Sequence, residues 1–67
     1  MHYWKVIDKK TEQEVKDVRH FIVGAPGRAR WVYILENVQT KEIIAASATA
    51  ELAIGATIHA QDIQPIG

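Results

Sequence analysis

The side chains in this sequence that could perform chemistry are three histidines, one serine and eight carboxylates. His2, His20 and His59 are not spaced from one another, or from acidic residues, in a known zinc-binding pattern. Ser47 lies in an alanine-rich run, and nothing beside it marks an activated nucleophile. The segment 24–27, Gly-Ala-Pro-Gly, lacks the residues of a phosphate-binding loop. We therefore expect no metal, no cofactor and no catalytic residue, and hence a protein that is not an enzyme.

One cluster of basic and aromatic residues is suited to binding a partner rather than to catalysis. Arg28, Arg30 and Trp31 follow the Gly-Ala-Pro-Gly turn, and Arg19 and His20 belong to the strand expected before it. If the two strands pair, these basic groups converge beside an aromatic ring. Such an arrangement suits phosphate contact and base stacking, as in proteins that bind single-stranded nucleic acid. The candidate binding residues are Arg19, His20, Arg28, Arg30, Trp31 and Tyr33.

Simpler interpretations of the same residues stay open. Trp31 falls in the segment expected to be most buried, and arginines on a neutral chain also form a solvated face or pair with acidic residues. The four rings of Tyr3, Trp4, Trp31 and Tyr33 are many for so small a core. They either fill that core or extend to an interface with another protein.

The size and charge of the chain limit its partners. Its 67 residues form one domain, residues 1–67, and without cysteine no disulfide stabilises so small a core. We expect self-association, most simply as a homodimer. Eight basic residues balance eight acidic ones, so no long-range field attracts nucleic acid or an anionic membrane. The apolar runs are too short to span a bilayer and residues 1–5 show no secretory signal, so we expect no membrane contact and a cytoplasmic location.

The first half of the chain is expected to form strands. Residues 3–7 are aromatic and β-branched and precede a polar break. Residues 15–23 favour a second strand, although Thr11 and Glu14 fit a capping box and the apolar spacing also fits a helix. Residues 30–35 alternate between two apolar sets, which predicts a central strand covered on both faces.

The second half continues with a hairpin and a closing segment. The polar residues 36–41 join the central strand to an apolar run at 42–47. Ser47 or Thr49 is expected to cap a short helical turn that ends at Gly55. Residues 57–59 favour a last strand, followed by a tail in which Pro65 must lie at a sheet edge or outside the sheet.

A weak internal echo connects the two halves. The segment from Trp4 to Val15 has the same plan as the segment from Trp31 to Ile43: an aromatic strand, a polar turn with Thr and Glu, and a β-branched residue. This similarity predicts two hairpins in tandem, through duplication or through the common composition of hairpins.

These elements predict a mainly β fold, a small antiparallel five-stranded barrel of the SH3-like or OB-like kind with one short helical turn near the C-terminus. The alternative is an α+β fold in which residues 12–19, residues 41–52, or both are helical. For function, we expect a non-enzymatic interaction module that self-associates and binds a protein partner. The alternative is a small nucleic-acid-binding barrel that uses Arg19, Arg28, Arg30 and Trp31.

Overall fold

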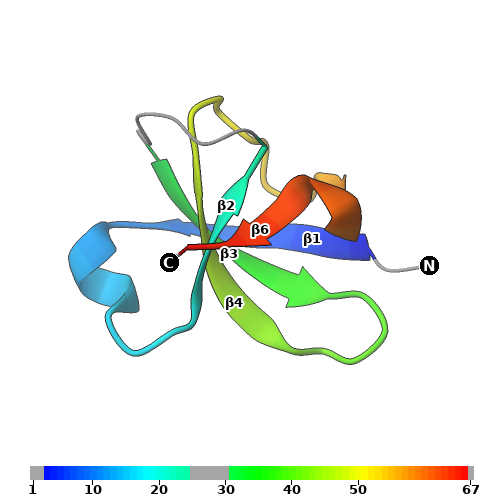
Figure 1. Ribbon diagram of the computed structural model, residues 1–67, viewed down its shortest axis with the longest axis horizontal. Coiled ribbons are helices and arrows are strands. Elements are labelled where there is room, and N and C mark those ends of the chain that lie inside the picture. Colours follow the sequence, from blue (N-terminus) through cyan, green and yellow to red (C-terminus); the bar gives the residue numbers. More distant parts are fainter. Residues whose placement is uncertain (1–2, 25–30, 67) are drawn as a thin grey trace.

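The described part of the chain, residues 3–24 and 31–66 of a computed structural model, folds into one strongly curled sheet (Figure 1). Its strands are β1 (Tyr3–Lys10), β2 (His20–Val23), β3 (Trp31–Asn37), β4 (Ile43–Ala48), β5 (Thr57–His59) and β6 (Ile63–Pro65). Two 3-10 turns, η1 (Glu12–Val15) and η2 (Ala60–Asp62), complete the list. The expected mainly β, small barrel-like fold is confirmed, with six strands rather than five in the described residues.

The strands lie in the order β5-β1-β3-β4-β2-β6. Every neighbouring pair is antiparallel except β2 and β4, which run parallel. The parallel pair arises because β2 and β3 follow each other in sequence but are separated by β4 in space. The sheet is therefore mixed, and the expectation of a purely antiparallel barrel was wrong at this pair.

The hairpin predicted between the two central strands is confirmed. β3 and β4 pair antiparallel along their length. Asn37 is buried at the end of β3, and its side-chain oxygen accepts the backbone N–H groups of Gln39 and Thr40, each at 2.9 Å. This amide therefore fixes the turn from inside the fold.

The chain itself holds the two ends of the sheet together. β5 pairs with β1 at one end and β6 pairs with β2 at the other, yet only the three residues of η2 separate β5 from β6. So short a link requires the sheet to curl until its edges approach each other (Figure 1). The register of β1 against β3 also shifts between Val6 and Asp8, and this irregularity adds to the bend.

The curled sheet carries an apolar layer on each face. The inner layer is the main core, formed by Val6, Tyr33, Leu35, Ile44, Ala46, Ala48 and Ile58. The outer layer consists of Val15, Val32 and Ala45, with Val15 supplied by η1. β4 presents alanine to both layers, which allows β3 and β2 to pack closely on either side of it. The prediction of a central strand covered on both faces is confirmed for β3.

The long strand predicted over residues 15–23 is wrong. The Thr11 N–H donates to the Glu14 carboxylate at 2.8 Å, which forms the capping box and starts η1. Strand structure begins only at His20. One turn suffices to bury Val15 in the outer layer, so the helical alternative holds for a single turn only. In the other segment for which a helix was considered, residues 41–52, the structure has strand β4.

Of the two tandem hairpins suggested by the internal echo, the described residues contain the second, β3–β4, but not the first, because β1 and β2 do not pair. β1 pairs with β3 and β5, whereas β2 pairs with β4 and β6. Thr11 precedes η1, while Thr40 lies in the β3–β4 turn, so their surroundings do not correspond. Similar strand and turn composition accounts for the echo.

The helical turn near the C-terminus lies later than predicted. Residues 49–56 form a connection without helix, and the turn is η2 instead. Gly55 has φ +94°, as expected for the residue that closes this segment, and its N–H donates to the Val6 carbonyl at 2.7 Å. Pro65 lies in the edge strand β6, as predicted.

Candidate interaction surface

The predicted binding residues do not converge in the structure. Arg19 and His20 stand at the start of β2, and Trp31 and Tyr33 lie in β3, with β4 between the two strands. Strands two positions apart in a sheet are separated by about 10 Å. The predicted cluster depended on pairing of these two strands, and that condition is not met. Arg28 and Arg30 lie outside the described residues.

The two aromatic candidates point toward the main core. Tyr33 is fully buried, and its hydroxyl accepts the Leu52 backbone N–H at 2.8 Å. Trp31 is half-buried and packs against the same core. The Lys9 ammonium lies 5.8 Å from the centroid of the Trp31 ring and 3.7 Å from the Glu51 carboxylate. Tyr33 is thus a core residue, and Trp31 already has a cation of its own chain beside it.

Arg19 is exposed but engaged within the chain. Its guanidinium forms an ion pair with Glu42 and lies 5.8 Å from the centroid of the Phe21 ring. The charge that the nucleic-acid alternative needs is therefore balanced locally. This contact could not be read from the sequence, because it depends on the parallel pairing of β2 with β4.

The parallel pairing also brings His20 and Ser47 together, although 27 positions separate them in sequence. The His20 Nε2 and Ser47 Oγ atoms lie 3.3 Å apart. A nucleophile and base of this kind need a third group that orients the imidazole. In the part of the chain that the structure describes, no carboxylate hydrogen-bonds to this ring, and Ser47 is only 4 % exposed. The contact gives the buried Ser47 hydroxyl a hydrogen-bond partner.

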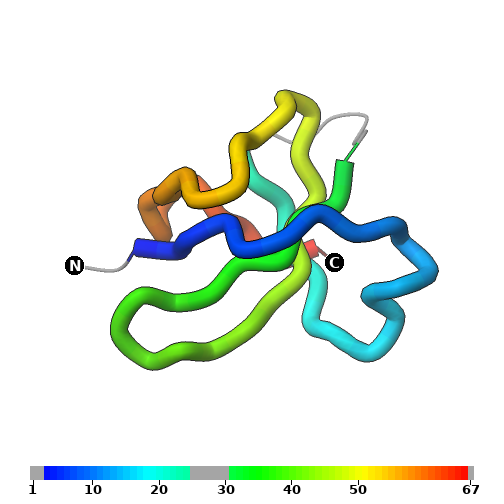
Figure 2. The backbone as a smooth tube through the Cα atoms, turned by 180° about the vertical axis from the view of Figure 1, so that it is seen from behind, coloured from blue at the N-terminus to red at the C-terminus, as the bar shows by residue number. Residues whose placement is uncertain are grey.

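An exposed group of apolar side chains lies elsewhere, on the outer face where β1 begins. Tyr3, Val38 and Ile43 are 36, 46 and 41 % exposed. The Val38 N–H donates to the Tyr3 carbonyl at 3.0 Å, which places these residues side by side, and Ile43 lies opposite Glu36 in the next strand pair. Figure 2 shows the start of β1 between the β3–β4 hairpin and the segment of β5 and η2. We name Tyr3, Val38 and Ile43 the apolar strip.

Charged residues of both signs lie beside the apolar strip. Lys5 and Glu36 are direct partners across β1 and β3, so their side chains leave the same outer face. Lys5 is exposed and Glu36 is half-buried. The ion pairs of the described residues include neither of them. At one end of the strip, the Tyr3 and His59 rings meet edge to face, with centroids 5.1 Å apart.

Sequence reasoning had identified only one member of the apolar strip, Tyr3, as a surplus aromatic residue. Val38 lies in the turn and Ile43 at the start of a strand that is otherwise buried, so neither stands out. A possible signal was Val38 itself, an apolar residue in a polar hairpin connection where solvation alone would favour a polar side chain.

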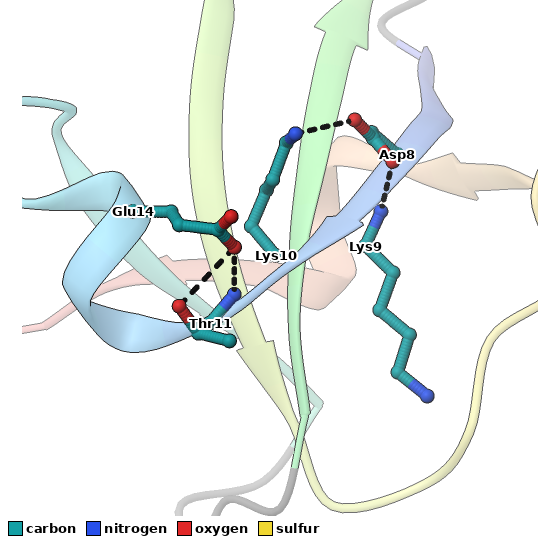
Figure 3. Close-up of polar contacts among 5 residues, drawn as sticks. All are labelled: Asp8, Lys9, Lys10, Thr11 and Glu14. Atoms are coloured by element: carbon teal, nitrogen blue, oxygen red, sulfur yellow. Dashed lines mark hydrogen bonds and ion pairs between the residues drawn. The ribbon is translucent and has the colours of Figure 1, made fainter.

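A second charged group stabilises the start of η1 (Figure 3). Asp8 accepts the Lys9 N–H at 2.8 Å and pairs with the Lys10 ammonium at 3.0 Å. The Lys10 side chain and the Lys9 N–H lower the pKa of Asp8, and Asp8 raises the pKa of Lys10. Hydrogen bonds from Thr11 lower the pKa of Glu14. These contacts are at the surface and serve the turn rather than a binding pocket.

Residues 3–24 and 31–66 contain no group of three or more metal-ligating side chains placed to hold an ion, and no helix among them could cross a membrane. Comparisons with protein-family models, with curated proteins and with solved structures find no match for this chain.

Proposed function

We propose that this protein is a non-catalytic interaction module that associates with a second copy of itself through the apolar strip. The observation that carries this proposal is the exposure of Tyr3, Val38 and Ile43 together on one face. Contiguous apolar residues on a small domain mark an interaction surface more often than isolated ones do. A small core without disulfides also gains stability from association.

The small size of the apolar strip limits the affinity that we expect for the dimer. Burial of a whole Val, Ile or Tyr side chain contributes about 1.5–3 kcal/mol, and these side chains are already more than half covered. Association costs at least about 4 kcal/mol in lost translational and rotational freedom. A dimer built on this surface is therefore weak, with Kd at about the millimolar level, and forms only at high protein concentration.

Sedimentation equilibrium over a wide concentration range tests the proposal. The natural chain should show a monomer–dimer equilibrium, and Val38→Lys and Ile43→Lys should each raise Kd at least about tenfold, because each places a charge in the buried surface. Ile54→Lys is the matched control: Ile54 is 60 % exposed, apolar and outside the apolar strip. It should leave Kd unchanged.

A monomer at every concentration, with a melting temperature that does not depend on concentration, would refute the proposal. So would a dimer that Ile54→Lys disrupts and the two strip variants do not. Cytoplasmic location belongs to the same proposal, and cell fractionation tests it.

A further inference from the structure

We propose that the two copies meet with their outer faces together, about a two-fold axis that lies above the outer face, runs along the strand direction and passes midway between Lys5 and Glu36, so that Lys5 of each copy faces Glu36 of the other. This inference rests on the proposed function and specifies its geometry. In this geometry, the charges of Lys5 and Glu36 determine which protein surface can bind to the apolar strip.

The positions of the two charges lead to this arrangement. Lys5 and Glu36 are directly opposite each other in the β1–β3 pairing. Two residues further along, the Val38 N–H donates to the Tyr3 carbonyl, and hydrogen-bonded positions alternate in an antiparallel pair, so Lys5 and Glu36 also form a hydrogen-bonded pair. Their Cα atoms are then about 5.5 Å apart. A two-fold rotation exchanges the two positions, which places the ammonium of one copy on the carboxylate of the other on both sides of the axis.

The ion pairs among the described residues use other charges. Lys9 pairs with Glu51, Lys10 with Asp8, and Arg19 with Glu42. Within the described residues, Lys5 and Glu36 take part in none of these ion pairs. They lie beside Tyr3 and Ile43, which exclude water from the contact once it forms. Partial desolvation strengthens a charge pair relative to one in open solvent.

The balance of charge favours a second copy over a charged ligand. A phosphate backbone or an acidic surface would meet Glu36 as well as Lys5, and a basic surface would meet Lys5 as well as Glu36. A second copy presents both signs in the order that the first copy requires. The chain also has no net charge, so two copies approach without long-range repulsion.

The test is a charge-reversal experiment by sedimentation equilibrium at low salt, on Lys5→Glu, on Glu36→Lys and on their equimolar mixture. Each variant alone places like charges in contact on both sides of the axis, so Kd for its homodimer should rise about tenfold. In the mixture, every reversed side chain meets an opposite charge. A 1:1 heterodimer should therefore form, with Kd within about threefold of the natural homodimer.

Lys16→Glu and Glu12→Lys are matched controls, because they make the same changes of charge at exposed positions outside the apolar strip. Both should dimerise like the natural chain, and circular dichroism should show that all four variants stay folded. If the strip variants abolish dimerisation but the single reversals do not, or if the mixture fails to recover it, this pairing is wrong and the proposed function stands. If the natural chain is monomeric throughout, the proposed function fails and this inference with it.

Discussion

The hydroxyl of Tyr33 accepts the backbone N–H of Leu52 at 2.8 Å. This bond joins the middle of β3 to the connection of residues 49–56, which contains no regular element of its own. Leu52 also packs against the main core. A ring that sequence reasoning considered for binding therefore positions a loop from within the core.

Tyr33→Phe should lower the free energy of unfolding by about 1–2 kcal/mol, because it leaves the Leu52 N–H without its acceptor while the ring stays packed. Chemical denaturation measures this change. If Tyr33→Phe has no effect on stability or on amide exchange at Leu52, the hydroxyl does not hold the connection.

Ala46→Leu should destabilise the fold by about 1–3 kcal/mol, since Ala46 is fully buried between Phe21 of β2 and Tyr33 of β3. The larger side chain would have to force the neighbouring strands apart. Thermal unfolding checks the prediction. Ala50→Leu, at an exposed position after β4, should be close to neutral. Equal melting temperatures for the two variants would contradict the close packing of β4.

The surface group at η1 predicts a pH response. The folded pKa values of Asp8 and Glu14 lie below their ordinary values of 3.8 and 4.5. Each contact thus contributes stability above those values, and the contribution is lost as pH falls through the lower folded pKa. Because the groups are exposed, the effect on global stability is small, and carboxyl NMR titration is the suitable measurement.

In that titration, Lys10→Gln should raise the pKa of Asp8 toward 3.8, because the Lys10 ammonium is the largest cause of its lowering. Lys16→Gln is the control, and it should leave the titration of Asp8 unchanged. An unchanged Asp8 pKa in Lys10→Gln would show that the ion pair does not persist in solution.

Binding to single-stranded DNA should be weak, with Kd about 10⁻⁴ M or above in physiological salt, the level of non-specific contacts. The physical reasons are the zero net charge and the pairing of Arg19 with Glu42. Fluorescence anisotropy across a salt series measures this. Micromolar binding that is lost in Arg28→Ala with Arg30→Ala would contradict the prediction and favour the nucleic-acid alternative.

The sequence by itself determined the local structure where neighbouring residues supply the signal. Alternation of apolar residues identified β3, and the polar connection after it identified the hairpin. Thr11 and Glu14 predicted the capping box, and Gly55 predicted a residue with positive φ. Each of these features depends on hydrogen bonds or steric limits within a few residues, so its cause is visible along the chain.

Only the tertiary structure decided which strands pair and which faces stay exposed. The internal similarity favoured pairing of β1 with β2, whereas the fold pairs β1 with β3 and inserts β4 beside β2. That choice depends on how the whole chain buries its two apolar layers. It separates Arg19 from Trp31, buries Tyr33 and brings Lys5 beside Glu36. Burial is a property of the assembled sheet, because a side chain becomes covered only when residues distant in sequence pack against it.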